Sequence, residues 1–571
     1  MIKKKLVVLS SLVFSFPVLF ASLVAATTQI NAATLPRNQA EPKNEKKIQN
    51  PKSKIQNRMR VIVNSNRDGA IAPDAYLTLR EAIEIVNGTL PLDKLSQAEK
   101  ESVKSLAASE RSQIAFNLPT GQTTIQLTDI LPPLATPGTV VDGTTQPEYT
   151  QKMGDKRTQG QLPSTNYLYR RSSATSLAIT KPLVAITPAP QVEIFRGLTV
   201  VADGVTIRGL SLYGFTAQPR TTVSTPPADI FIADEVTAAQ TSQQKFTPQA
   251  QSQPPKDVVI ENNWLGSPDS SDTSLRSAFG VSVFNSLGTT IRQNRIANHD
   301  GSGIITGKQA EDLRIINNII EHNGYSGMPD AIRLEGKITN SEIISNLIQD
   351  NAGSAIYTFK PEGSVLIRNN NISNNGTRFQ RAAIYLMGND HAVINNIIRV
   401  QTGSGVVVAA YPQSRRNRIQ GNEFGGIAGL AIDLVTQQNV SPQDYQQGDG
   451  ANPPTDSYQR RRKTGNFGID APRWLSPEFL IIDPKTGVRL DGVAQPGSQV
   501  EIYRSGRNAG TQELIGKPIA TVNVNQKGRF SLKLGNLKPG ERVSAIATHP
   551  QYGTSEPAVN ALIQSTDPTD L

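Results

Sequence analysis

The chain has 571 residues, a formal net charge of +10 and no cysteine, so disulfides, thiolate metal sites and lipid attachment through cysteine are excluded. Lys3, Lys4 and Lys5, together with a basic excess of six in 37–60, carry nearly all of this charge. The body, 61–571, is almost neutral, whereas a nucleic-acid-binding body carries a basic face of its own. We therefore expect no nucleic-acid partner.

Residues 1–32 are predicted to be a secretory signal peptide, because basic residues precede a long apolar run and small residues follow it. Cleavage is expected after Ala26 or Ala32, and a retained membrane anchor is the alternative. Residues 33–58 are rich in Lys, Asn, Gln and Pro, which predicts a disordered basic linker. We expect a secreted, periplasmic or outer-surface protein with no transmembrane segment after signal removal.

An N-terminal cap with the first coils is predicted over 59–190. The spacing of Leu79, Ile83 and Val86 predicts a short amphipathic helix, and strand-like segments precede and follow it. A repeat array must seal its apolar end with an atypical unit, and this mixture of a strand, a helix and further strands suits that purpose.

A repeating phrase occupies 191–435, with an aliphatic residue three positions before a recurring asparagine and an apolar residue two positions after it. A fixed period of 20 to 50 residues indicates a solenoid, in which each unit buries its apolar face against its neighbours. The recurring asparagines are Asn263, Asn294, Asn318, Asn346, Asn370, Asn396 and Asn422.

Each repeat holds three short runs dominated by β-branched residues and separated by Asn and Gly turns. Their period-two alternation predicts strands, and the third run, such as Ile332–Leu334 or Ile356–Thr358, follows a variable loop. Three short parallel strands per coil define a β-helix, an all-β solenoid. An inward asparagine amide at each bend can bond unpaired backbone groups and the next asparagine, so we predict a structural ladder of stacked asparagines.

The chain after the last repeat changes character twice. Residues 436–475 are polar and irregular, which predicts a linker. Residues 476–565 contain about seven short alternating strands separated by Pro-Gly, Lys-Gly and Tyr-Gly turns, a pattern typical of a small immunoglobulin-like β-sandwich.

The repeats resemble right-handed parallel β-helix proteins of the pectin-lyase-like superfamily. Leu77-Thr-Leu-Arg-Glu-Ala-Ile83 and Val141-Asp-Gly-Thr-Thr-Gln-Pro147 are similar to motifs of a bacterial exported subgroup, with Glu148 in place of a glycine. The tract that begins with Ala431-Ile-Asp-Leu434 is a third point of similarity. The resemblance implies a right-handed coil, makes Ile332–Leu334 part of the first sheet, and places carbohydrate sites on that sheet and its preceding loops.

Outward positions of this first sheet are the binding candidates: Arg333, Glu335, Tyr357, Phe359 and Tyr385. Stacked coils place Tyr357 beside Tyr385. Aromatic faces beside charged groups suit a sugar ring, so we predict a solvent-facing carbohydrate platform. The plain alternative is that aromatic residues favour exposed strand positions.

Weak catalytic candidates are Arg333, Asp330, His322 and Arg381, because a polysaccharide lyase needs a base and a cation near the sugar carboxylate. Asp300 and Asp330 are two candidate calcium ligands, but calcium takes six to eight oxygens. We therefore expect no metal site and no cofactor, with calcium as the open alternative.

Three functions remain open on the sequence. The first is a non-catalytic exported protein that binds polysaccharide or another cell-surface polymer. The second is a polysaccharide lyase or epimerase acting on an acidic glycan, and the third is a purely structural adhesin. The sequence leans away from an enzyme because the outward column of the first sheet holds a single acid, whereas hydrolysis needs a close pair.

Overall fold

A computed structural model describes residues 58–149, 179–216, 226–241, 253–411, 413–436, 446–457, 463–483, 487–506, 508 and 510–565. The predicted signal peptide, 1–32, and nearly all of the predicted linker 33–58 lie outside these residues. Within the described ranges, no helix is both long enough and apolar enough to cross a membrane.

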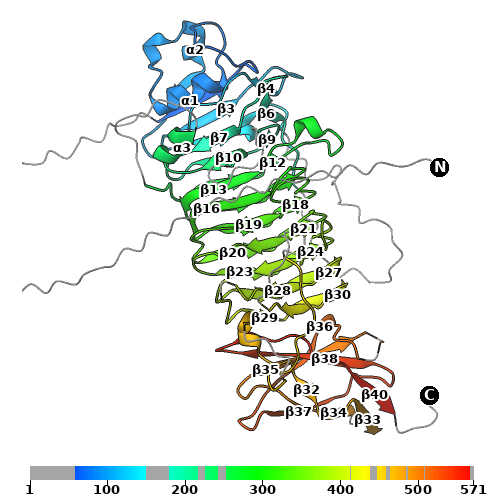
Figure 1. Ribbon diagram of the computed structural model, residues 1–571. Coiled ribbons are helices and arrows are strands. Elements are labelled where there is room, and N and C mark those ends of the chain that lie inside the picture. The colour runs from blue at the N-terminus through cyan, green and yellow to red at the C-terminus, as the bar shows by residue number, and fades with distance from the viewer. Residues whose placement is uncertain are drawn as a thin grey trace, which may run out of the picture. The chain divides into compact units, whose positions relative to one another are not determined.

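Three parallel sheets wind around one core, and Figure 1 shows their strands stacked in chain order. Sheet A contains β2 (Val103–Ser105), β1 (Met59–Val63), β3 (Gln113–Phe116), β5 (Val140–Asp142), β8 (Thr206–Arg208), β11 (Val259–Glu261), β14 (Thr290–Arg292), β17 (Arg314–Ile316), β20 (Ser341–Ile344), β23 (Val365–Arg368), β26 (Ala392–Ile394) and β29 (Arg418–Gln420). All its neighbours pair in parallel except β1 and β2, which are antiparallel.

Sheet B contains β4 (Thr124–Leu127), β6 (Val184–Pro188), β9 (Leu210–Leu212), β12 (Trp264–Leu265), β15 (Arg295–Ala297), β18 (Ile319–Glu321), β21 (Leu347–Gln349), β24 (Asn371–Ser373), β27 (Ile397–Gln401) and β30 (Glu423–Ile427). Sheet C contains β7 (Arg196–Val200), β10 (Ala228–Ile232), β13 (Val281–Leu287), β16 (Ile304–Glu311), β19 (Ile332–Leu334), β22 (Ile356–Thr358), β25 (Ile384–Leu386), β28 (Val406–Val408) and β31 (Ile432–Leu434). The predicted all-β, three-sheet solenoid is confirmed.

The core is a column of stacked aliphatic side chains, because the strand register repeats without slipping along sheet A. The central residue of each strand points inward, so Ile260, Ile291, Ile315 and Ile343 lie on top of one another and are fully buried. Each such side chain stabilises the fold by about 1.5–3 kcal/mol. The residues on either side of this column face outward.

Asparagine amides connect successive coils at the bend between sheets A and B. Asn346 Nδ2 donates to Asn370 Oδ1 at 3.0 Å and to the carbonyl oxygen of Ile315 at 2.9 Å. The same amide-to-amide contact joins each neighbouring pair from Asn263 to Asn422. The residue before the ladder position has positive φ, and Gly209 and Gly421 occupy this place at the two ends, where a left-handed conformation favours glycine.

A second, shorter ladder lies five residues further on, at the bend between sheets B and C. Asn323 Nδ2 donates to Asn351 Oδ1 at 2.9 Å, and Asn351 donates to Asn375 Oδ1 at 2.8 Å. His299 takes the same place one coil earlier and contacts Asn323 Oδ1 at 2.7 Å and Asp229 Oδ2 at 2.8 Å. These groups are fully buried, so the imidazole forms part of the wall.

Helix α1 (Leu79–Asn87) closes the N-terminal end of the core. Thr78 and Glu81 form a reciprocal capping box at its start, and Gly88 ends it in a left-handed conformation. Leu79 and Ile83 join the same apolar cluster as the solenoid strands. The remaining helices are α2 (Gln97–Glu101), α3 (Glu235–Thr241) and the short 3₁₀ turns η1 (Leu92–Lys94), η2 (Gly143–Thr145), η3 (Thr273–Leu275) and η4 (Gly465–Gly468).

The C-terminal strands form a unit with its own apolar core, centred on residues such as Val488, Val500 and Ile563. Its strands are β32 (Arg473–Trp474), β33 (Glu478–Asp483), β34 (Gly487–Val493), β35 (Gln499–Ser505), β36 (Ile515–Asn523), β37 (Arg529–Leu534), β38 (Arg542–His549), β39 (Gly553–Thr554) and β40 (Ala561–Ser565). Most of them pair antiparallel. The immunoglobulin-like character of this unit stays a prediction.

This C-terminal unit also packs directly against the last coil. Tyr503 and Ile546 belong to the apolar cluster of the solenoid, and the Tyr503 ring lies 6.2 Å from that of Phe424. The carboxylate of Glu501 accepts a hydrogen bond from the Gly421 amide at 3.1 Å. The unit therefore closes the C-terminal end of the core, as α1 closes the other.

Candidate functional site

The predicted catalytic candidates on sheet C meet in a buried ion cluster. The carboxylate of Asp330, which is fully buried, lies 3.5 Å from Arg333 and 3.7 Å from Arg381. Burial raises the pKa of Asp330, while the two guanidinium groups oppose that shift. Arg333 also contacts Glu335. Because the carboxylate is fully buried and both arginine side chains are largely buried, we interpret the cluster as structural support for the turn before β19.

The predicted carbohydrate platform is wrong in one respect: its two tyrosine rings do not face solvent. Tyr357 and Tyr385 are neighbours across β22 and β25, with ring centroids 5.7 Å apart, but they are 0% and 6% exposed. They pack with Ala382, Met387 and Val407 in a second apolar cluster on the outer side of sheet C. The spacing of residues in the sequence predicted that the two tyrosine side chains point out of sheet C, but it could not show which residues cover them.

Phe359 lies beside Tyr357 and Arg333. Its ring lies 5.8 Å from that of Tyr357, and the guanidinium carbon of Arg333 lies 4.9 Å from the centroid of each ring. The aromatic residues thus cover a buried cation. Tyr357 and Tyr385 are buried by these contacts, whereas Phe359 is half-buried.

The other predicted residues are not brought into this cluster. His322 lies in the turn after β18 with positive φ, and within the described chain its imidazole makes no hydrogen bond or ion pair. Asp300 lies 3.9 Å from Arg276, and Asp330 is surrounded by arginines. The described residues contain no group of three or more His, Asp or Glu side chains placed to hold a metal ion.

A hollow of about 570 Å³ lies elsewhere, on the outer face of sheet A over the N-terminal coils. Its floor is built by outward side chains of β1, β3, β5, β8, β11 and β14, which are consecutive strands of the sheet. At about 4.8 Å per strand the floor is about 24 Å long. The hollow is lined by Arg60, Leu106, Ser109, Glu110, Arg111, Gln113, Val140, Thr206, Arg208, Val259, Glu261 and Arg292.

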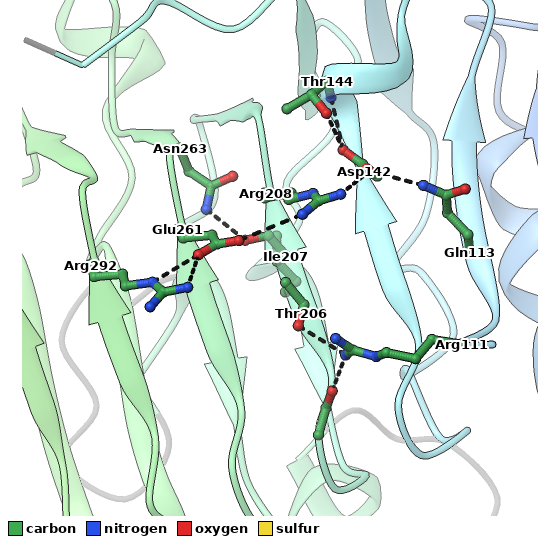
Figure 2. Close-up of polar contacts among 11 residues, drawn as sticks. Arg111, Gln113, Asp142, Thr144, Thr206, Ile207, Arg208, Glu261, Asn263 and Arg292 are labelled. Atoms are coloured by element: carbon green, nitrogen blue, oxygen red, sulfur yellow. Dashed lines mark hydrogen bonds and ion pairs between the residues drawn. The ribbon is translucent and has the colours of Figure 1, made fainter. Parts of the chain in front are cut away.

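Along one row of this floor, acids and arginines alternate from strand to strand (Figure 2). Arg208 lies between Asp142, at 2.6 Å, and Glu261, at 3.8 Å. Arg292 reaches the other side of Glu261, with its Nε and one terminal nitrogen on the same oxygen at 2.8 and 2.5 Å. The hydrogen bond to Asp142 is the main cause that raises the pKa of Arg208, so this guanidinium stays charged.

Asp142 lies at the N-terminal end of that row and accepts hydrogen bonds from several groups. Gln113 Nε2 donates to its Oδ2 at 2.9 Å, and the Thr144 amide donates to its Oδ1 at 3.2 Å. Although burial raises it, the pKa of Asp142 is lowered overall by the hydrogen bonds from Arg208 and Thr144. This carboxylate therefore remains an acceptor and is not a proton donor at neutral pH.

Two further arginines in the hollow have no carboxylate partner among the described residues. Arg111 donates through Nε to the Gly138 carbonyl at 2.8 Å and through a terminal nitrogen to Thr206 Oγ1 at 2.9 Å and the Gly204 carbonyl. Burial lowers the pKa of Arg111, the positive charge of Arg208 lowers it further, and the negative charge of Glu261 opposes this shift. The hollow thus keeps positive charge that its own acids do not neutralise.

Arg60 is the least satisfied of these cations. Its Nε is buried without a hydrogen-bond partner, and within the described ranges its guanidinium takes part in no ion pair. It enters the hollow from β1, at the first outward position of the floor. Buried donors without partners are rare in folded proteins, so this atom marks a place where a ligand acceptor would be favourable.

The sequence reasoning missed this hollow, although one signal in the repeats pointed to it. Arg208, Glu261 and Arg292 all stand two positions before the ladder slot, so an alignment of the phrases shows an alternating charge column there. Arg60 and Arg111 lie outside the repeating phrase, and only stacking brings them to the same face.

The chain has the fold of a right-handed parallel β-helix. The model of a right-handed beta helix region matches residues 326–441. No curated protein matches the sequence. Solved structures are similar in fold at low identity.

The enzymatically active domain of tailspike protein 2 from bacteriophage CBA120 is 10% identical, with 80% of this chain and 72% of that chain covered and a TM-score of 0.35. The periplasmic alginate epimerase AlgG is 11% identical, with coverages of 68% and 76% and a TM-score of 0.35. The A-module of the Azotobacter vinelandii mannuronan C-5 epimerase AlgE4 is 14% identical, with coverages of 57% and 82% and a TM-score of 0.33.

Proposed function

We propose that this protein binds a polysaccharide, without turnover, in the hollow on sheet A. The observation that carries the proposal is the elongated hollow itself, whose volume of about 570 Å³ lies within the range of roughly 300–1,000 Å³ typical of ligand sites. A floor about 24 Å long suits a chain of sugars better than a single small molecule.

The chemistry of the lining supports a sugar ligand. Hydroxyl and amide groups of Ser109, Gln113 and Thr206 offer hydrogen bonds, and Val140 and Val259 offer apolar contact. Sugars present both hydroxyl groups and C–H faces, so a mixed lining of this kind matches them. The floor is a paired β-sheet, which holds the side chains in fixed positions and reduces the ordering entropy lost on binding.

The acids in the hollow support binding rather than hydrolysis. Glu261 is ion-paired with Arg292 and Arg208, and Glu110 accepts a hydrogen bond from the Ala107 amide at 2.8 Å. A glycosidase uses one acid that keeps its proton and one that acts as nucleophile or base. Both carboxylates here are engaged in other contacts.

The test is a glycan array with purified protein, followed by titration of the best binders. Val259→Trp would fill the hollow and should abolish binding, whereas Leu366→Trp, which faces outward in the same row of sheet A beyond the hollow, should leave binding unchanged. The proposal fails if no glycan binds, or if both tryptophan variants bind as tightly as the parent.

Turnover is measured in parallel, because a lyase or epimerase would also bind polysaccharide. Ultraviolet absorbance of unsaturated uronates reports lyase action, and proton exchange at the sugar ring reports epimerisation. Binding with neither signal supports a non-catalytic role. Product formation that is lost in Val259→Trp would assign catalysis to this hollow and overturn the non-catalytic reading.

A further inference from the structure

We propose that the hollow on sheet A is an oxyanion site, and that its ligand is a polysaccharide bearing carboxylate or sulfate groups. This inference rests on the proposed function and adds the chemical class of the ligand. The lining contains four arginines and two glutamates, and Asp142 pairs with one of these arginines, so positive charge exceeds negative charge.

The excess charge comes from two arginines of the hollow. Arg208 and Arg292 are neutralised by Asp142 and Glu261, whereas Arg60 and Arg111 have no carboxylate partner among the residues that the structure describes. Arg60 belongs to β1, at one end of the floor, whereas the Arg111 guanidinium lies at the starts of β5 and β8, where it bonds the Gly138 and Gly204 carbonyls and Thr206. A ligand anion would bind first at these two arginines, because there it displaces no internal ion pair.

Two observations indicate that these arginines lack a ligand acceptor. The Nε of Arg60 is buried and has no partner, and proximity to Arg208 lowers the pKa of Arg111 in addition to the larger effect of burial. An oxyanion at Arg60 would accept a hydrogen bond from the buried Nε, and an oxyanion at Arg111 would offset the positive charge of Arg208. Guanidinium groups bind carboxylate and sulfate with charge-assisted hydrogen bonds, about twice as strong as neutral ones.

The ligand is a polymer rather than a free anion, because a second hollow continues the first. It has a volume of about 430 Å³ and is lined by Lys256, Asp257, Leu287, Gly288, Thr290, Asp312 and Arg314. Thr290 pairs with Val259 of the first hollow across adjacent strands. An acidic chain lying across the strands would pass from Arg60 toward Arg314.

The experiment compares matched ligands by isothermal titration. Oligogalacturonate is compared with its carboxyl-reduced form, and dextran sulfate with dextran, so that charge is the difference within each pair. We expect both charged polymers to bind at least tenfold more tightly than their neutral counterparts. Binding should weaken with added salt, because charges at the surface are screened. If only one of the two charged polymers binds, that result shows whether the site prefers carboxylate or sulfate.

Arg60→Gln is the informative variant, because the parent side chain has no hydrogen bonds to lose within the described structure. It should weaken binding of the charged polymer about tenfold or more, as expected for loss of one charge-assisted contact. Arg60→Lys should retain part of the affinity, because the positive charge remains but the two-pronged hydrogen bonding of the guanidinium group is lost. Arg368→Gln is the control, an exposed arginine on the same face outside the hollow.

The outcomes separate this inference from the proposed function. If the neutral polymer binds as tightly as the charged one, or if Arg60→Gln and Arg368→Gln behave alike, the oxyanion site is overturned while polysaccharide binding stands. If no polymer binds, both proposals fail. Thermal melting of every variant establishes that a loss of binding is not a loss of fold.

Discussion

The hydroxyl of Tyr503 donates a hydrogen bond of 3.2 Å to the main-chain oxygen of Asn422, the last asparagine of the ladder. The same ring packs against Phe424 in the solenoid core. A stacked core exposes apolar surface and unpaired backbone groups at its ends. Tyr503 meets both requirements at once, so the C-terminal unit acts as an end cap.

Truncation of this ring should destabilise the whole chain. Tyr503→Ala should lower the free energy of unfolding by about 3–5 kcal/mol, the range for deletion of a buried aromatic ring. Tyr503→Phe, which keeps the ring and loses the hydroxyl with its contacts to Asn422 and Glu501, should lower it by about 1 kcal/mol. Chemical denaturation measures both. Equal effects of the two variants would contradict the packing role of the ring.

The asparagine ladder should contribute through its buried hydrogen bonds. Asn346→Ala removes the side-chain donor to the Ile315 carbonyl and the side-chain oxygen that accepts from the amide and Nδ2 of Asn318, which should destabilise the protein by about 1–3 kcal/mol. Asn371→Ala is the matched control, because Asn371 sits next to the ladder position on β24 and is only half-buried. A ladder variant as stable as this control would show that neighbouring groups replace the lost contacts.

The buried rings on sheet C should be structural. Tyr357→Ala should destabilise by about 3–5 kcal/mol because the ring is fully buried, whereas Phe379→Ala, at an exposed ring, should change stability by less than about 0.5 kcal/mol. Thermal melting distinguishes them. If Tyr357→Ala changes the stability as little as Phe379→Ala does, the ring is not structural and the surface platform becomes tenable again.

The junction between the last coil and the C-terminal unit should respond to pH. Burial, followed by the negative charges of Glu556 and Asp449, raises the pKa of Asp433 to about 8. Its ordinary value is 3.8, so between about pH 4 and pH 8 the folded state holds a proton that the unfolded state has released. The stability contributed by this proton is complete below pH 4 and is lost as the pH rises toward 8.

Denaturant titrations at pH 5, 6, 7 and 8 test this, with a slope of up to about 1.4 kcal/mol per pH unit for one proton. Glu556, whose pKa burial also raises, should act in the same direction. Asp433→Asn mimics the protonated form and should flatten the profile. A parent protein with equal stability from pH 5 to pH 8 would contradict the prediction.

The order of strands and their inward faces follow from local patterns, which is why they were predictable from the sequence. Ile332–Leu334 and Ile356–Thr358 were expected as strands and are β19 and β22. They were predictable because the alternation of apolar and polar residues with period two involves only neighbouring residues. The second ladder, at Asn323, Asn351 and Asn375, carries the same period and was visible in principle.

The binding face could not be predicted in the same way. Spacing showed that the side chain of Tyr357 points out of sheet C, but exposure depends on what packs over it, and that is a property of distant segments. The prediction that the two tyrosine rings face solvent failed for this reason.

The sequence by itself therefore determined a stacked β-solenoid, since each coil repeats the same local pattern of strand residues, bend residues and inward aliphatic residues. Only the tertiary structure decided where a ligand can bind. Arg60, Arg111 and Arg292 are separated by up to 232 residues along the chain and share no phrase. Stacking at about 4.8 Å per coil brings them to one face, where the sum of their charges, rather than any single motif, defines the site.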